Sequence, residues 1–318
     1  MPDTEITFEH IRAAAERIRP TVRRTPVMTS RSFDAEAGVT AFFKCENLQT
    51  GGAFKIRGAS NFIFSIPKDQ LRTGVVAHSS GNHAQAVAIA AQVAGTSATL
   101  VMPADAPRAK LEGTRARGAK IVTYDRLTGN REAISGRIAA ETGATLVPPY
   151  DHPWTIAGQG TAAMELLEEV PDLDALVVCV GGGGLMSGSS IAAHHLRPSI
   201  RIFGVEPDTA NDTFLSFAAG ERVTIATPPT IADGLRSTTP GALTFPILQK
   251  HVERMITVSD DEIRATLKFL LMRLKILVEP SGAVSAAAAF AKKLPSAIGR
   301  VGIILSGGNV DYEQLAAL

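Results

Sequence analysis

The sequence predicts an α/β fold built around a mostly parallel β-sheet. Short runs rich in β-branched residues alternate along the chain with alanine-rich helical stretches, and turn residues separate them. Some of the β-rich runs, such as residues 175–180, are apolar at every position, which is typical of strands in a sheet covered on both faces. With 318 residues, the chain is long enough for one large domain or two modest ones.

The predicted elements follow one another in a regular order. The predicted strands are residues 40–45, 74–78, 98–102, 120–124, 175–180, 200–205 and 301–305. The predicted helices include residues 83–93, 106–117, 131–142, 156–169, 186–195 and 260–271. A proline-rich segment at residues 148–153 interrupts the alternation, and we predict a boundary there because consecutive prolines favour extended chain.

The composition is that of an ordinary globular protein. Hydrophobic residues make up 45% and charged residues 20%, and the net charge of +1 gives no reason to expect a nucleic-acid or membrane partner. The acidic start lacks the pattern of a signal peptide, and no apolar run approaches the roughly 18 residues of a membrane helix. Cys45 and Cys179 are predicted to be buried free thiols. We therefore expect a cytoplasmic protein without an anchor.

Lys55 lies in a distinctive context, after two glycines and between Phe54 and Ile56. This context predicts the start of a helix with the lysine facing inward. Burial lowers the pKa of a lysine, because desolvation disfavours the ammonium form. The neutral amine can then form a Schiff base with an aldehyde. A lysine taken alone is more often exposed, with its stem packed on the surface.

Four consecutive glycines, Gly181, Gly182, Gly183 and Gly184, follow the predicted strand 175–180 and precede a helix. Such a loop lets several backbone N–H groups point at one anion, and the helix N-terminus favours a phosphate. A dinucleotide-binding loop is an alternative, but the G-x-G-x-x-G pattern fails in both registers. A tight turn without a ligand is the other alternative.

A second polar loop, Ser79-Ser80-Gly81-Asn82-His83, follows the predicted strand 74–78 and opens a helix. Two hydroxyls, a glycine and the free N–H groups of a helix start form an anion site that suits an amino-acid carboxylate. An ordinary serine N-cap would explain one serine but not the whole group. Later in the chain, Ser306-Gly307-Gly308-Asn309 follows the strand 301–305, and this motif alone is typical of a turn.

Glu206, Ala210 and Asp212 form a smaller group of candidate ligands. Two carboxylates with a backbone carbonyl between them can hold a hard divalent cation through oxygen atoms. Solvated loop carboxylates are the alternative interpretation of this spacing.

A Schiff-base lysine, a phosphate-binding glycine loop and a hydroxyl for a ring nitrogen are together what pyridoxal 5'-phosphate (PLP) requires. These residues resemble the fold type II PLP enzymes, specifically the serine/threonine dehydratase and serine racemase family. The resemblance covers nearly the whole chain, in the family's order. Its further motifs are Arg24-Thr25-Pro26, Lys44-Cys45-Glu46-Asn47 and Ala157-Gly158-Gln159-Gly160-Thr161. It implies two open, twisted, mostly parallel sheets flanked by helices, with the cofactor between a large domain (1–73 and 152–318) and a small mobile domain (74–151).

The resemblance also implies roles for the single residues. The residues that would contact PLP are Lys55 as the Schiff-base lysine, Phe54 beside the cofactor, Asn82 at the ring hydroxyl, Gly181, Gly182, Gly183 and Gly184 at the phosphate, Ser306 at the pyridine nitrogen and Glu279 near the ring. The residues that would hold the substrate carboxylate are Ser79, Ser80, Asn82 and His83. In racemising relatives, the serine that matches Ser80 is also an acid/base on the face opposite the lysine. Glu206, Ala210 and Asp212 match the family's site for a divalent cation (Mg, Mn or Ca).

The implied activity is that of a β-hydroxy amino acid dehydratase. Lys55 would remove the α-proton of L-threonine, L-serine or 3-hydroxyaspartate, and loss of the β-hydroxyl would lead to a 2-keto acid and ammonia. A serine hydroxyl at the ring nitrogen makes the cofactor a weaker electron sink than a carboxylate would, which favours prompt β-elimination. Serine racemisation is left open as a second activity. The chain ends at Leu318, where biosynthetic threonine dehydratases carry a regulatory domain, so we expect a catabolic or racemase-like role. The resemblance also implies a homodimer.

The candidate substrates differ only in their β-substituent. A β-carboxylate requires a cation or hydrogen-bond donors, and we name Arg131 and His152 as the candidates. Their ordinary interpretations are a solvated helix residue and a loop residue. Two alternatives to a lyase stay open at this point, namely a PLP-dependent β-replacement enzyme such as a cysteine synthase and a non-catalytic binding protein that retains the fold.

Overall fold

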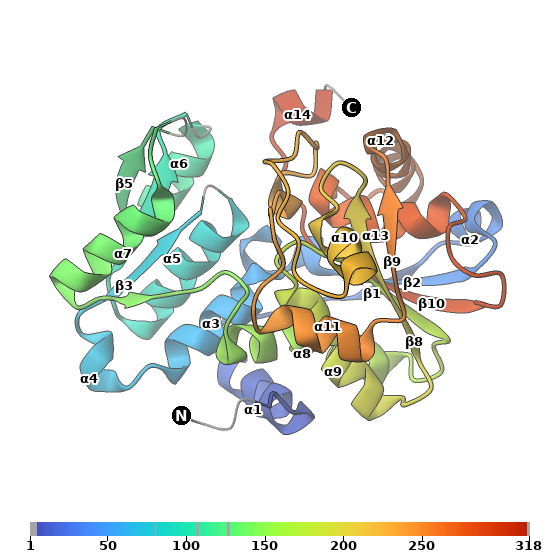
Figure 1. Cartoon of the computed structure of the whole chain (residues 1–318), viewed down its shortest axis with the longest axis horizontal. Coiled ribbons are helices and arrows are strands. Elements are labelled where there is room, and N and C mark those ends of the chain that lie inside the picture. Colours follow the sequence, from blue (N-terminus) through green and yellow to red (C-terminus); the bar gives the residue numbers. More distant parts are fainter. Residues whose placement is uncertain (1–4, 80, 106–107, 126–127, 317–318) are drawn as a thin grey trace.

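The chain forms two β-sheets that lie side by side with helices around and between them (Figure 1). The structure, a computed structural model, describes residues 5–79, 81–105, 108–125 and 128–316. Each sheet has its own hydrophobic core, as expected for an α/β fold with two layers of helices.

The larger sheet has six strands in the order β1-β2-β10-β7-β8-β9. These strands are β1 (Val27–Thr29), β2 (Thr40–Cys45), β10 (Arg300–Leu305), β7 (Ala175–Cys179), β8 (Arg201–Pro207) and β9 (Arg254–Val258). Only β1 runs antiparallel to its neighbour, and the other pairs in this sheet are parallel. Every residue of β7 is buried, which confirms the prediction from its continuous apolar run.

The smaller sheet has four parallel strands in the order β5-β4-β3-β6. They are β5 (Lys120–Tyr124), β4 (Ala98–Pro103), β3 (Val75–His78) and β6 (Thr145–Leu146). All the strands predicted from the sequence are present to within two residues at each end. The sequence did not predict β1, β6 and β9.

The helices fill the segments between the strands. They are α1 (Phe8–Ile18), α2 (Arg31–Ala37), α3 (Lys55–Ser65), α4 (Lys68–Leu71), α5 (Asn82–Ala94), α6 (Arg108–Arg115), α7 (Arg131–Thr142), α8 (Pro153–Glu169), α9 (Gly184–Leu196), α10 (Asp212–Ala219), α11 (Thr244–His251), α12 (Asp260–Phe269), α13 (Pro280–Phe290) and α14 (Tyr312–Ala316). The prediction of α7 was right at both ends. The first two residues of the helix predicted at 106–117 lie outside the described residues.

The helix α3 connects the two halves of the molecule (Figure 1). Its apolar residues, including Ile56, Ala59 and Ile63, belong to the core of the four-stranded sheet. Its other side packs on α8, where the two backbones approach closely because Gly58 and Gly158 face each other. A Cβ at Gly158 would lie 2.5 Å from the carbonyl of Arg57 and 2.9 Å from Cα of Gly58. The predicted domain division at residues 73/74 and 151/152 stays a prediction.

A second close crossing joins α8 to α9. A Cβ at Gly160 would lie 2.6 Å from the carbonyl oxygen of Gly188, and one at Gly188 would lie 2.2 Å from that of Ile156. The glycines of the Ala157-Gly158-Gln159-Gly160-Thr161 motif therefore allow three helices to stack. Because α3 begins with Lys55 and α9 begins in the glycine run, this stack connects two parts of the predicted cofactor site.

Four buried charged side chains bind one another beneath the start of α3. The guanidinium of Arg57 donates to both carboxylate oxygens of Glu46 at 2.7 and 2.8 Å and to both of Glu165 at 2.7 and 2.8 Å. The amine of Lys44 lies 2.7 Å from the same Glu165 carboxylate. Arg57, Lys44 and Glu46 are fully buried, so these charges balance one another out of contact with water.

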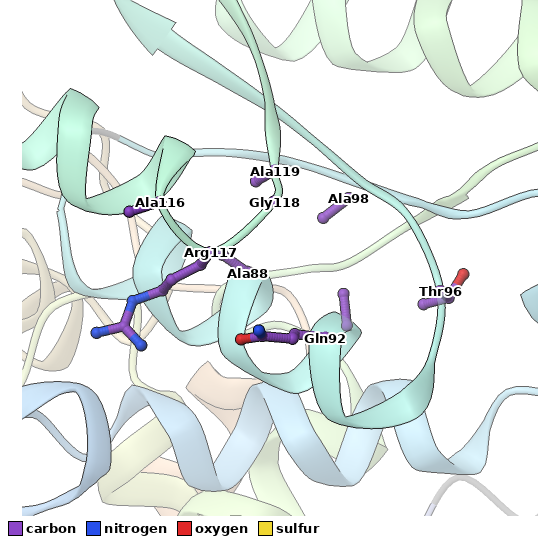
Figure 2. A pocket seen from close by; sticks show the side chains of 9 residues that line it. Ala88, Gln92, Thr96, Ala98, Ala116, Arg117, Gly118 and Ala119 are labelled. Carbon is purple, nitrogen blue, oxygen red and sulfur yellow. The ribbon is translucent and has the colours of Figure 1, made fainter.

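A cavity of about 370 Å³ lies in the smaller half, between α5 and the segment that leads into β5. Figure 2 shows Ala88 and Gln92 of α5 together with Arg117 and Gly118 around it. None of the residues that line it belongs to the predicted site. Within the described part of the chain, no helix combines the length and the apolar character needed to cross a membrane.

Candidate active site

Lys55 is the first residue of α3, and the glycine pair before it is required by the backbone. Gly51 and Gly52 both have φ values of +74°, in the left-handed region that favours glycine. A Cβ at Gly52 would also lie 2.2 Å from Oδ1 of Asn309. Gly51 and Gly52 thus form a turn that few other residues could adopt, and this turn sets the position of Lys55.

The Lys55 amine lies against protein atoms although the residue as a whole is only half-buried. Its Nζ donates a hydrogen bond to the carbonyl of Pro149 at 2.9 Å and lies 5.0 Å from the centre of the Phe54 ring. Burial lowers the pKa of Lys55 to about 8, with Cys179 and Glu279 opposing the change. A substantial fraction of the amine is therefore neutral near pH 8, as a Schiff-base lysine requires.

Phe54 and Ser306 lie together because the chain before α3 pairs with the end of β10. The N–H of Phe54 donates to the carbonyl of Ser306 at 3.0 Å, and the N–H of Gly308 donates to that of Gly52 at 2.8 Å. Ser306 is buried, with 3% of its surface exposed. Its side chain hydrogen-bonds the thiol of Cys179, whose pKa is raised by burial, so this cysteine is a neutral structural thiol.

Asn82 and Glu279 belong to one hydrogen-bonded chain that reaches the lysine loop. Nδ2 of Asn82 donates to Oε1 of Glu279 at 2.6 Å, and Oδ1 of Asn82 accepts from Nδ2 of Asn309 at 2.8 Å. Asn309 also donates to the carbonyl of Gly51 at 2.7 Å. A Cβ at Gly307 would lie 2.3 Å from Oε1 of Glu279, which explains the glycine there. The structure therefore brings both predicted residues to the loop that carries Lys55.

The glycine run forms a tight loop at the start of α9, and packing explains three of its four glycines. Gly183 has φ of +93° and is the N-cap of α9. A Cβ at Gly182 would lie 2.4 Å from the Tyr150 ring, and one at Gly184 would lie 2.5 Å from Oε1 of Gln159. These positions are glycine because neighbouring side chains occupy the place of a Cβ.

Gly181 has no such packing reason. A Cβ there would meet no protein atom closer than 3.5 Å, which is ordinary contact, and its φ is not positive. Backbone N–H groups at a helix start form a cradle for phosphate, and the lack of a side chain allows an anion to approach closely. Together with the Lys55 amine and the Ser306 hydroxyl, this cradle fits PLP.

The proline-rich segment lies at the site through Pro149, Tyr150 and Asp151, three residues that the sequence analysis did not name. The ring of Tyr150 lies across Gly182, and the carboxylate of Asp151 accepts hydrogen bonds from the N–H groups that open α11. Pro149 contributes the carbonyl that binds Lys55. The sequence marked this segment as a boundary and offered only His152 as a site residue, because the contacts of the other three depend on how distant segments meet.

The predicted carboxylate loop lies at the start of α5. Oγ of Ser79 accepts from the N–H of Gly81 at 3.2 Å, while Ser80 lies outside the described residues. His83 is buried, its Nε2 lies 3.0 Å from the carbonyl of Val147, and burial lowers its pKa to about 3, so the ring is neutral. The groups left for an anion here are the first N–H groups of the helix, including those of Asn82 and His83.

Arg131 begins α7 at the same end of the four-stranded sheet as this loop. Its Nε donates to Oε1 of Glu132 at 2.8 Å, and that oxygen lies 3.6 Å from Nε2 of His78, the residue before Ser79. The Arg131 side chain is 49% exposed and lies within electrostatic range of Tyr150. The structure thus places Arg131 at the same end of the sheet as the carboxylate loop, where Glu132 lies between it and His78.

His152, the second candidate for a β-carboxylate, caps a helix. Its Nδ1 accepts the N–H of Trp154 at 3.1 Å as the N-cap of α8, and its ring lies 4.7 Å from that of Phe62. Burial lowers the pKa of His152, so it carries little positive charge at neutral pH. Because its contacts are those of a helix cap in an aromatic cluster, we do not include His152 among the proposed substrate-binding residues.

Glu206 and Asp212 are buried close to each other at the end of β8. The Glu206 carboxylate accepts the N–H groups of Thr213 at 3.2 Å and Phe214 at 2.7 Å. Burial and then the nearby Asp212 raise the pKa of Glu206, and burial raises that of Asp212 to about 7. The part of the chain described contains no group of three or more His, Cys, Asp or Glu side chains placed to hold a metal. Ala210 is buried in the turn between the two acids.

The comparisons with known proteins identify the family. The family described as pyridoxal-phosphate dependent enzyme matches residues 18–307. The chain is 48% identical over 310 residues to a serine racemase of Schizosaccharomyces pombe (strain 972 / ATCC 24843), covering 98% of this chain and 96% of that protein. It is 49% identical over 312 residues to an L-threo-3-hydroxyaspartate ammonia-lyase of a Pseudomonas species, covering 98% of each.

A solved structure gives the same result. The structure of maize serine racemase matches with a TM-score of 0.94 and 46% sequence identity, covering 98% of this chain and 96% of the other. The predicted α/β fold of the type II PLP enzymes is therefore confirmed. The match over nearly the full length, together with the lysine, the glycine cradle and the buried serine, shows that this chain belongs to the family of pyridoxal-phosphate dependent enzymes.

Proposed function

We propose that this protein is a PLP-dependent ammonia-lyase that converts a β-hydroxy amino acid to its 2-keto acid and ammonia. L-Serine, L-threonine and 3-hydroxyaspartate are the proposed substrates. The observation that carries the proposal is the Lys55 amine, with its lowered pKa, in a loop bonded to the start of α5 and close to the glycine cradle of α9. The names of the similar proteins, a serine racemase and a hydroxyaspartate ammonia-lyase, support the same substrate class.

Bound PLP supplies an electron sink for the α-carbon of an amino acid. The glycine run would hold its phosphate, Ser306 would face its ring nitrogen, and Asn82 and Glu279 would lie beside its ring. Lys55 moves the α-proton at Nζ, because its pKa of about 8 leaves part of the amine neutral at the pH of reaction. The buried, neutral hydroxyl of Ser306 cannot balance a charged ring nitrogen as a carboxylate could.

The substrate's two ends are recognised by different parts of the smaller half. The free N–H groups at the start of α5 would hold the α-carboxylate, together with Ser79. Arg131 would bind a β-carboxylate, because it is a half-exposed cation that begins α7 at the same end of the four-stranded sheet as this loop. We therefore propose 3-hydroxyaspartate as the preferred substrate. Ser80 is proposed as the acid/base of a racemase activity.

The test is release of ammonia and keto acid from L-serine, D-serine, L-threonine and the four stereoisomers of 3-hydroxyaspartate, with PLP and magnesium present. We expect release from at least one of them, and most from a 3-hydroxyaspartate isomer. A chain that releases no ammonia from the whole panel but forms cysteine from O-acetylserine and sulfide would be a β-replacement enzyme instead. A purified protein that stays colourless after incubation with PLP would be a non-catalytic relative.

Replacing Arg131 with alanine is expected to lower kcat/KM for 3-hydroxyaspartate by about 10- to 100-fold, the effect of losing a hydrogen bond to a charged group. The kcat/KM values for L-serine and L-threonine should change little, because these substrates have no second carboxylate. His152→Ala is the matched control: it removes a helix cap and should lower stability without changing the ratio between substrates. An equal loss for all three substrates would contradict the role given to Arg131.

We also propose that Glu206, Asp212 and the carbonyl of Ala210 hold a divalent cation such as Mg²⁺, Mn²⁺ or Ca²⁺. Two buried carboxylates disfavour each other's charge, and a hard cation with oxygen ligands relieves this. Chelation of the metal is expected to lower the melting temperature, and added cation at 100 times its Kd should restore about 2.7 kcal/mol. Glu206→Gln should abolish the response, while the exposed Glu253→Gln should retain it. A metal-stripped protein with full stability and activity would refute the site.

The assembly and the location of the protein stay predictions of the sequence. We propose a homodimer in the cytoplasm, and sedimentation of the PLP-loaded protein would determine its oligomeric state.

A further inference from the structure

Packing alone does not explain why a glutamine side chain is buried at position 159. It lies in α8, one residue after Gly158, and only 1% of its surface is exposed. Its Oε1 has no hydrogen-bond partner among the described residues. A buried acceptor without a donor is costly, and most native proteins contain few of them.

The other end of the same amide fixes which way it points. Nε2 of Gln159 donates to the carbonyl of Pro149 at 3.2 Å, the same oxygen that accepts from Nζ of Lys55 at 2.9 Å. The reverse orientation of the amide would place Oε1 of Gln159 against the carbonyl oxygen of Pro149, two acceptors in contact. The unpartnered atom is therefore Oε1 and not Nε2. The Gln159 amide and the Lys55 amine therefore meet around one carbonyl oxygen.

The surrounding backbone holds this arrangement closely. A Cβ at Gly58 would lie 2.9 Å from Cγ of Gln159, and Gly58 shares the face of α3 that carries Lys55, three residues earlier. A Cβ at Gly184 would lie 2.5 Å from the orphan Oε1. The oxygen thus lies in the space between the start of α3, which carries the lysine, and the start of α9, which carries the glycine cradle.

The amine of Lys55, which binds the same carbonyl as Nε2 of Gln159, has hydrogen-bond donors to spare. An ammonium group has three hydrogen-bond donors, and Pro149 accounts for one of those of Lys55. In the structure, Nζ of Lys55 binds the Pro149 carbonyl and is not hydrogen-bonded to Oε1 of Gln159. We infer that Gln159 is a positioning residue for Lys55: when the amine is free of the cofactor and carries a proton, a rotation of the lysine side chain lets Oε1 and the Pro149 carbonyl hold it together.

This arrangement acts at the proton-transfer step. When Lys55 takes the α-proton, the C–H bond of the substrate breaks, an N–H bond forms at Nζ, and the electron pair stays with the carbon. The new ammonium has to be held until the proton is passed on, and two carbonyl-type oxygens favour the charged form. Gln159 thus stabilises the protonated lysine without touching the substrate.

The test measures the pKa of Lys55 in the apoenzyme, by labelling the amine with acetic anhydride across a pH series and quantifying the Lys55 peptide by mass spectrometry. Gln159→Met keeps the side-chain volume and removes the acceptor, and it should lower the pKa of Lys55 by about 1. Gln159→Glu adds a negative charge and should raise it. In the PLP-loaded enzyme, Gln159→Met should lower kcat by about tenfold with little change in KM.

The control is Asn61→Leu, which removes another buried amide from the contact of α3 with α8, where Asn61 donates to the carbonyl of Trp154 at 2.6 Å. It should lower stability and leave the pKa of Lys55 unchanged. The inference would be overturned if the pKa of Lys55 were the same in the wild type and in both Gln159 variants. If Gln159→Glu does not fold, the pKa of Lys55 in Gln159→Met decides the question. The labelling needs no substrate, so its outcome is independent of whether the proposed lyase activity is found.

Discussion

Replacing Lys55 with alanine is expected to lower the rate of ammonia release by about 10²- to 10⁴-fold, because the amine that moves the α-proton is lost. The variant should also lose the covalent attachment of PLP, since the amine that lies at the carbonyl of Pro149 is removed. Steady-state rates and the visible absorbance of the dialysed protein measure the two effects separately.

Lys55→Arg is the matched variant, since it keeps a positive charge on a long stem but forms no Schiff base. We expect it to fold as stably as the wild type and to be as inactive as the alanine variant. Substantial activity in either variant would mean that another group moves the proton, and Lys55 would then have only a binding role.

The largest loss of stability is expected from Arg57→Met. The guanidinium of Arg57 is fully buried and binds Glu46 and Glu165, so removing it leaves two carboxylates facing the single charge of Lys44, and one buried negative charge is uncompensated. Breaking such a buried pair costs about 3–5 kcal/mol. Urea unfolding followed by circular dichroism would measure the change in the free energy of unfolding.

The comparison is Arg201→Met, which removes an exposed guanidinium that binds Glu253 at 2.6 and 2.8 Å. Its pair has similar geometry but lies in water, where it contributes little to stability. If the two variants lost the same free energy of unfolding, burial would not be what makes the Arg57 group important. The expected order is a large loss for Arg57→Met and a small one for Arg201→Met.

The parts of the site that could be predicted from the sequence are those that follow buried strands locally. The glycine run after β7 and the Ser306 motif after β10 each combine a continuous apolar run with glycine or hydroxyl residues, so fold class and cofactor loops follow from neighbouring residues. Lys55 was found for the same reason, because the glycine pair before it marks a special turn.

The rest depends on contacts between distant segments. Tyr150 has no local pattern that indicates a function, and it meets the site only because its ring lies against Gly182. The motif around Gln159 was recognised, but its sequence does not show that this side chain lies where α8 crosses α3 and α9. The sequence did not show that His152 would cap α8 by accepting the N–H of Trp154, and its predicted role at the substrate stays a prediction. Among the strands, β6 has two residues, and β9 mixes exposed and buried positions, so neither has a periodicity long enough to detect.

The glycine crossings of α3, α8 and α9 have a consequence for how such an enzyme can change its substrate. Because these helices touch backbone to backbone, the distance from the reactive amine to the phosphate cradle cannot be adjusted by small side-chain changes. Variation in substrate must then come from the other wall, where Arg131 lies half-exposed in the smaller sheet's helices. The stack of α3, α8 and α9 keeps the cofactor in one position. The side chains of the other wall can be replaced to bind a different amino acid.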